Sequence, residues 1–181
     1  ATIGNPDNVS VTEDSNAGTD NKLYAHGNIS INDVDDGENS FSTTVTSATG
    51  NLGSLTLGSD GSYTYSVDND SVQYLGADKS KTENFTIKSL DGTTKDISFT
   101  IYGANDPAKI GDMVLTTLTE DQNVAGDFLS LSGTLSISDP DTGDALFRMQ
   151  GIPVGSCLGS LTLSPEGKYV YGISNTKVQY L

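Results

Sequence analysis

The chain has 181 residues, enough for one or two domains that each bury a core. Glycine is abundant (20 residues) and charged residues make up only 18% of the chain, a composition typical of all-β proteins with many turns. The net charge of −15 excludes nucleic acids and anionic membrane surfaces as partners, because no Lys/Arg patch exists to pair with phosphates, whereas clustered carboxylates suit divalent cations.

The first unit spans residues 1–108, and its alternating apolar residues predict seven strands. Tight hairpins are expected at Asp60-Gly61 and Asp91-Gly92, since glycine accepts a positive φ and aspartate supports the turn. These features predict an antiparallel Greek-key β-sandwich. The expected strands cover residues 9–13, 23–31, 39–46, 53–58, 62–67, 83–90 and 94–102.

The second unit, residues 109–181, repeats the first. Leu52-Gly-Ser-Leu-Thr-Leu57 and Val72-Gln-Tyr-Leu75 both recur 106 residues later, at Leu158 and Val178. Thr12-Glu13-Asp14 recurs as Thr119-Glu120-Asp121, and Asp33-Val-Asp35-Asp-Gly37 corresponds to Asp139-Pro-Asp141-Thr-Gly143. A period near 106 is the length of a complete sandwich domain and exceeds the roughly 20 to 50 residues of solenoid repeats.

The second unit has counterparts of the first five strands and lacks the last two, so we expect a truncated second repeat. Its uncovered sheet edge predicts strand exchange with a neighbour, completion by further sequence, or loose order. Cys157 is the only cysteine and corresponds to Asn51, which excludes an intrachain disulfide. No apolar run approaches the length of a membrane span, so direct membrane insertion is not expected.

Taken in order, these motifs resemble the VCBS-type repeat, a bacterial cadherin-like domain found in tandem in very large surface adhesins. The resemblance implies an extracellular role in cell adhesion and biofilm formation, with bound calcium and neighbouring repeats of the same polypeptide as partners. The segments that carry it are Thr12–Asp14, Asp33–Gly37, Gly53–Leu57, Asp60–Tyr65, Val72–Leu75 and Tyr102–Pro107.

Calcium needs roughly six to eight oxygen ligands, more than any short segment here supplies, so a site would combine several loops. The resemblance implies that calcium lies between consecutive domains. Ordinary turn formation by aspartate and asparagine remains the alternative at every position. The implied ligands are Asn105 and Asp106 of the linker, Glu13 and Asp14 of the preceding domain, Asp139 and Asp141 of the following one, their equivalents Asp33 and Asp35, and Glu120 and Asp121 for a further junction.

The sequence predicts no enzyme. His26 is the only histidine, its counterpart is Ser132, and the chain has no Trp to line a glycosidase cleft. The favoured function is a structural and adhesive repeat stiffened by calcium. The alternatives are a calcium-dependent module that binds surface glycans or exopolysaccharide, with Tyr24 or Tyr102 as exposed aromatics, and an accessory domain of a secreted hydrolase.

Overall fold

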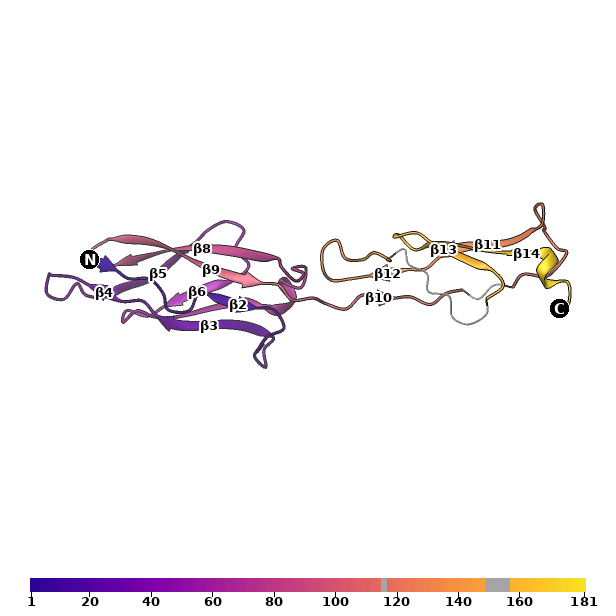
Figure 1. Ribbon diagram of the computed structural model, residues 1–181. Coiled ribbons are helices and arrows are strands. Elements are labelled where there is room, and N and C mark those ends of the chain that lie inside the picture. The colour runs from indigo at the N-terminus through magenta and orange to yellow at the C-terminus, as the bar shows by residue number, and fades with distance from the viewer. Residues whose placement is uncertain (115–116, 149–156) are drawn as a thin grey trace. The chain divides into compact units, whose positions relative to one another are not determined.

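The structure is a computed structural model that describes residues 1–114, 117–148 and 157–181. The chain divides into two compact units, Ala1–Asp106 (unit 1) and Pro107–Leu181 (unit 2), shown in Figure 1. Both are built from strands, which confirms the predicted all-β sandwich class. Within the described ranges no helix is long and apolar enough to cross a membrane.

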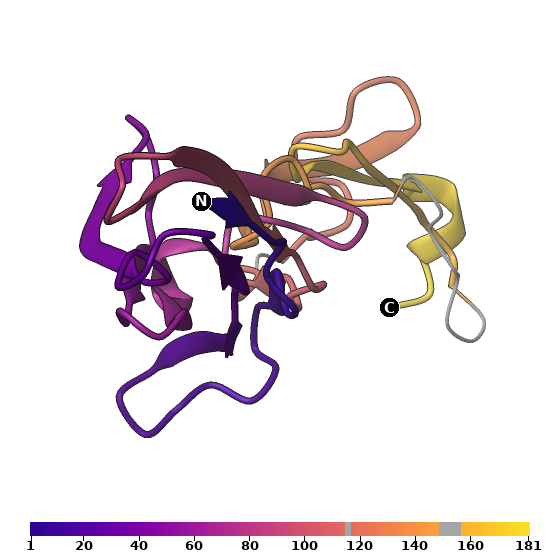
Figure 2. The ribbon, with the colours of Figure 1, turned by 90° about the vertical axis from the view of Figure 1, so that its left-hand side faces the viewer.

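Unit 1 is a sandwich of two sheets, seen in Figure 2 from the end that carries the N-terminus. One sheet has the order β2-β9-β8-β5 and the other β3-β7-β6, while β1 and β4 form a separate pair. All pairs in the unit are antiparallel except β2 with β9. The strands are β1 (Thr2–Ile3), β2 (Ser10–Thr12), β3 (Lys22–Asn28), β4 (Ile31–Asn32), β5 (Phe41–Ser47), β6 (Ser54–Leu57), β7 (Ser62–Asp68), β8 (Ser80–Ser89) and β9 (Thr94–Tyr102), with the 3-10 helix η1 (Asn69–Ser71) after β7.

The core of unit 1 lies between these sheets and follows the alternation of the sequence. Tyr65 on β7 stacks on Phe99 of β9, with ring centroids 4.6 Å apart, and Phe85 of β8 meets both rings edge-on. The predicted hairpin at Asp60-Gly61 is present, since Gly61 has a φ of +87° and the Ser62 amide donates to Asp60. The core therefore depends on β8 and β9, the two central strands of their sheet.

Unit 2 repeats only part of this arrangement. Its sheet β11-β14-β13 corresponds to β3-β7-β6, and its β10–β12 pair corresponds to β1–β4. The described residues contain no counterpart of β8 or β9. The elements are β10 (Lys109–Ile110), β11 (Phe128–Thr134), β12 (Ile137–Ser138), β13 (Ser160–Leu163), β14 (Lys168–Ser174) and the 3-10 helix η2 (Asn175–Val178).

Two strands expected in unit 2 differ from the prediction. The counterpart of β2, around Leu118, is not a strand, and neither is the described part of the counterpart of β5, around Phe147. The rest of that segment, 149–153, lies outside the described residues. In unit 1, β2 pairs only with β9, and β5 only with β8. Both are edge strands, so each needs a central strand for its hydrogen bonds.

Candidate functional site

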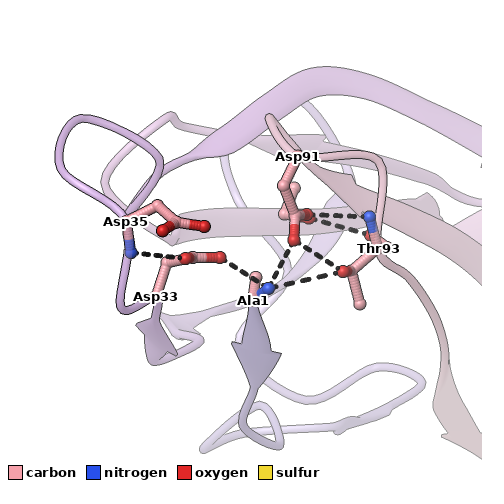
Figure 3. A network of polar contacts seen from close by, with 6 residues as sticks. Ala1, Asp33, Asp35, Asp91 and Thr93 are labelled. Carbon is pink, nitrogen blue, oxygen red and sulfur yellow. Dashed lines mark hydrogen bonds and ion pairs between the residues drawn. The ribbon is translucent and has the colours of Figure 1, made fainter.

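Acidic side chains gather at the end of unit 1 that carries the N-terminus. Asp33 follows β4, and Asp91 lies in the turn between β8 and β9, so two distant loops reach the same place (Figure 3). The Ala1 amine lies between their carboxylates, 2.5 Å from Asp33 Oδ2 and in direct contact with Asp91. We call Ala1, Asp33, Asp35, Glu38 and Asp91 the acidic cluster.

The carboxylates in this cluster are close enough to share a cation. Asp33, Asp35 and Glu38 each offer an oxygen within 4.8 Å of the others. Turn chemistry is present in the same loop, because the Asp35 amide donates to Asp33 Oδ1 at 2.9 Å. The Asp-x-Asp-x-Gly segment therefore forms a turn and also places carboxylates side by side, so the two alternatives for Asp33 and Asp35 are compatible.

Electrostatics in the cluster favour a positive charge. Hydrogen bonds to Asp33 and then to Asp91 raise the pKa of the Ala1 amine from 8.0 to about 10. The ammonium in turn lowers the pKa of Asp33, with a smaller contribution from the Asp35 amide. It also lowers the pKa of Asp91, assisted by the Ser89 hydroxyl. The cluster therefore holds one positive charge between carboxylates of two separate loops.

The opposite end of unit 1 carries Glu13 and Asp14, where the chain leaves the sandwich after β9. Glu13 is 1% exposed, and its Oε1 accepts the Ala104 amide at 2.6 Å. The Glu13 amide donates to the Tyr102 carbonyl at 3.0 Å, so this glutamate is tied to the residues that follow β9. In the linker, the Asn105 side chain donates to the Asp106 carbonyl at 2.9 Å.

Asp14 has a separate set of partners, which we call the Asp14 network. Its amide donates to Asn69 Oδ1 at 2.9 Å, and its Oδ1 accepts from Asn69 at 2.7 Å and from Gln73 at 2.9 Å. Asp14 adopts a left-handed φ of 57°, which aspartate tolerates better than most residues. The network ties the turn after β2 to η1. Both side-chain amides, of Asn69 and Gln73, donate to Oδ1 of Asp14 and leave its Oδ2 to other partners.

Unit 2 contains the same network around Asp121. The Asp121 amide donates to Asn175 at 2.9 Å, and Oδ1 accepts from Asn175 at 2.8 Å and Gln179 at 2.9 Å. These bonds lower the pKa of Asp121, with Asn175 as the larger cause. Glu120, the counterpart of Glu13, is half-buried.

Asp139 and Asp141 follow β12 as Asp33 and Asp35 follow β4. The Asp141 amide donates to Asp139 Oδ1 at 2.9 Å, the distance found in unit 1. Asp141 is 2% exposed, whereas Asp35 is exposed. The structure thus places Asp33/Asp35 and Asp139/Asp141 at equivalent positions, just after the strand pair that opens each unit.

Sequence reasoning missed three acidic residues. Glu38 follows the Asp-x-Asp-x-Gly motif directly, so its position in the sequence was a usable signal. Asp91 was assigned only to its hairpin, where it does accept the Thr93 amide at 2.8 Å, and nothing in the sequence links this turn to Asp33. Glu83 lies inside the core, and its signal was the alternation that also places Phe85 and Ile87 inward.

Glu83 on β8 is 0% exposed and accepts three hydrogen bonds, which we call the Glu83 network. The Leu52 and Gly53 amides donate to its two oxygens at 2.5 and 2.8 Å, and the Tyr65 hydroxyl donates at 2.8 Å. Burial, followed by the bond to Glu83, raises the pKa of Tyr65. The network connects β8 of one sheet to β7 of the other sheet and to the residues that precede β6.

Comparisons with known proteins agree with this architecture. Residues 1–103, more than half of the chain, match the family described as bacterial cadherin-like domain. The solved structure of protocadherin gamma B7 extracellular cadherin domains 1–4 is similar with a TM-score of 0.51 and 16% identity, over 94% of this chain and 41% of that one. The protocadherin gamma B4 extracellular domain is similar with a TM-score of 0.49 and 16% identity, over 93% and 26% of the two chains. No curated protein matched.

Proposed function

The chain belongs to the bacterial cadherin-like domain family, and on this premise we propose that its units are extracellular, non-catalytic repeats of a large bacterial surface adhesin. Membership confirms the cadherin-like resemblance read from the sequence motifs. The chain spans only 41% of the protocadherin chain above, so the adhesive and biofilm roles of a whole protein belong to the proposal. In such a protein these repeats would act as spacers between the cell and its target.

Calcium binding is the central part of the proposal, and the acidic cluster is the observation that carries it. Two loops hold a positive charge between Asp33 and Asp91, with Asp35 and Glu38 beside them. Carboxylate oxygens are the ligands that Ca²⁺ prefers, and water or backbone carbonyls complete its coordination. Where the nitrogen of Ala1 is an uncharged amide, these carboxylates lose their counter-charge and need another cation.

We propose that calcium also stiffens the junction between repeats. Domains joined by a short linker hinge by default, and a cation that takes ligands from both sides would limit this motion. The support is the order of groups along the chain: Glu13 is tied to the residues after β9, and Asp139 and Asp141 follow the strand pair that opens unit 2. The proposed junction ligands are Glu13, Asp14, Asn105, Asp106, Asp139 and Asp141, with Glu120 and Asp121 serving a further junction.

The experiment compares the chain with and without an acetylated N-terminus by calcium titration calorimetry. We expect affinities of about 10⁻⁴ to 10⁻³ M, the range of extracellular calcium modules. Acetylation removes the competing ammonium and should tighten binding. Asp33→Asn should weaken binding to the acetylated chain at least tenfold, whereas Asp60→Asn, in an exposed hairpin, is the matched control. If the free chain, the acetylated chain, Asp33→Asn and Asp60→Asn all give the same heats on titration with calcium, there is no site at the acidic cluster.

Small-angle scattering tests the junction separately. With calcium, the distribution of the radius of gyration of the full chain should be narrower than with chelator. In a double variant with Asp139→Asn and Asp141→Asn, this difference should disappear. The Asp33→Asn variant is the control, because it changes the acidic cluster and leaves the linker intact. If calcium binds but scattering stays the same, calcium binding stands and stiffening of the junction fails.

Sugar binding is a second candidate, favoured by a polar pocket of unit 1. The pocket measures about 280 Å³ and is lined by Asn8, Ser10, Thr12, Asn16 and Tyr24, with Ser15, Val11 and Leu23. Tyr24 is 38% exposed and stacks on His26 at 5.6 Å, which offers an aromatic face of the kind sugars pack against. A glycan array with the chain and with Tyr24→Ala, in calcium and in chelator, tests it; signals that Tyr24→Ala leaves unchanged would exclude this pocket.

A further inference from the structure

The N-terminal segment of unit 1 is fastened to β9, the last strand of the unit. β2 pairs with β9 in parallel, from Ser10 opposite Thr100 to Thr12 opposite Tyr102. Just before β2, the Val9 carbonyl accepts the Thr100 amide at 2.8 Å. The part of the chain that enters unit 1 and the strand that leaves it are therefore in direct contact and run in the same direction.

This arrangement decides how unit 1 responds to tension. Ala1 lies at one end of the unit, and the chain leaves at the opposite end after β9 (Figure 1). A pull on the two ends draws β2 toward Ala1 and β9 toward the linker, so the two strands are drawn past each other along their length. The bonds between them then share the load, whereas the bonds of a hairpin opened from its end break one at a time. The unfolding rate determines how long a domain withstands force.

Lys95 on β9 adds a side-chain contact to the segment that precedes β2. Its ammonium donates to the carbonyls of Ile3 and Gly4 at 2.9 Å each and to Asn5 Oδ1 at 2.8 Å. A lysine has three N–H donors, and all three are used by residues 3–5, which we call the strap. Among the described residues Lys95 forms no ion pair, although the chain has 24 Asp and Glu residues.

The strap is the first part of unit 1 that a pull on Ala1 reaches. It is also held by the Gly4 amide, which donates to the Ser30 carbonyl at 2.8 Å, and by the two residue pairs between β1 and β4. Lys95 is half-buried, and hydrogen bonds from a charged group are the strong ones. Because Lys95 belongs to β9, its contacts join the strap to the strand that carries the opposite load.

We propose that Lys95 is a load-bearing latch, which keeps the strap and β2 in register on β9 when unit 1 is under tension. While the latch is closed, its three contacts and the β2–β9 pairing share the force that arrives from Ala1. When it opens, that share passes to the three residue pairs of β2 with β9. The use of such a latch rests on the proposed role as a spacer of an adhesin, whereas the latch itself does not depend on calcium.

Optical tweezers test the latch on the full 181-residue chain. One handle is joined to the Ala1 amine and the other to Ala108→Cys in the linker, with Cys157→Ser to remove the native thiol, so that only unit 1 is loaded. All measurements are made in chelator, so the result is independent of the calcium proposal. Lys95→Met keeps most of the apolar stem and removes the three donors. It should shorten the lifetime of unit 1 at constant force about tenfold or more.

Lys88→Met is the matched control, because it makes the same change on β8 of the same sheet. Lys88 is exposed, and its ammonium makes no hydrogen bond or ion pair with the described residues. Its lifetime should stay within about threefold of the original chain. Asn5→Ala removes one of the three acceptors and should shorten the lifetime by a smaller factor than Lys95→Met, which keeps the test open if Lys95→Met does not fold.

A second pulling geometry separates a latch from a residue that only adds stability. Handles on Asp60→Cys and Ala108→Cys, again with Cys157→Ser, apply the force between the β6–β7 turn and the linker and leave the strap unloaded. In this geometry Lys95→Met and Lys88→Met should have similar lifetimes. If Lys95→Met shortens the lifetime equally in both geometries, Lys95 adds only to overall stability. If it leaves the lifetime unchanged in the first geometry, the β2–β9 pairing carries the load alone. Either result would overturn the proposal.

Discussion

Replacing Glu83 by glutamine tests the core of unit 1 with almost no change of shape. A glutamine keeps one acceptor oxygen, which can retain the bonds from Gly53 and Tyr65 to the same carboxylate oxygen. Its amino group would then face the Leu52 amide, donor against donor. Hydrogen bonds to charged groups contribute about 1.5–3 kcal/mol, and an unsatisfied buried donor costs about 1–3 kcal/mol.

One effect opposes this loss, because the substitution also removes a fully buried charge, whose desolvation is unfavourable. The carboxylate accepts three bonds of 2.5–2.8 Å, so we expect the lost bonding to dominate. The expected net loss is about 2–4 kcal/mol, a large part of the roughly 5–15 kcal/mol that stabilises a domain. Hydrogen exchange of β8 and β9 measures this free energy for unit 1 alone.

Asp36→Asn is the control, since it also replaces a carboxylate by an amide in unit 1 but at an exposed turn, and it should change stability by less than about 0.5 kcal/mol. A double-mutant cycle with Tyr65→Phe isolates the hydroxyl bond and should give a coupling of about 1 kcal/mol or more. If Glu83→Gln leaves unit 1 equally stable or more stable, burial of the charge dominates and the carboxylate is not needed for stability.

Two further predictions concern the ends of the units. The pKa of the Ala1 amine is raised from 8.0 to about 10, so the stability that its ion pairs contribute is complete below about pH 8 and is lost as pH rises to about 10. The melting temperatures of the free and the acetylated chain should therefore converge between these two pH values. A constant difference between the two melting temperatures across this range would contradict the raised pKa. Asn69→Ala and Asn175→Ala each remove the bonds of one aspartate network and should lower protection from hydrogen exchange by about 1–3 kcal/mol in their own unit, with Asn39→Ala, on an exposed loop of unit 1, as the control.

Local sequence patterns were enough to predict most of unit 1. Alternation predicts every long strand to within a few residues, because one face of each strand packs on a shared core. The two-residue strands β1 and β4 were missed, since a pair of two-residue strands is too short to show alternation. The Asp60-Gly61 turn was predictable because its requirement, a residue that tolerates positive φ, is local.

The acidic cluster could be predicted only in part. Asp33 and Asp35 belong to one motif, but Asp91 reaches them through the β8–β9 hairpin, a contact between loops far apart in the sequence. The absence of strands around Leu118 and Phe147 in the described part of unit 2 also depends on contacts between segments that are far apart in the sequence. Leu118 and its neighbours have the sequence of a strand, yet a strand at a sheet edge also needs a partner, and the partner of β2 is β9.

The polar contacts of the repeat fall into two sets, and only one of them requires β8–β9. The Asp14 network joins the turn after β2 to η1, and none of its members belongs to the hairpin. The bonds of Glu83 and Glu13 join the rest of the repeat to β8 or to the residues after β9. Among the described residues of unit 2, the first set is complete around Asp121 and the second set is not found. This division explains how the β11-β14-β13 sheet and η2 keep the geometry of their counterparts.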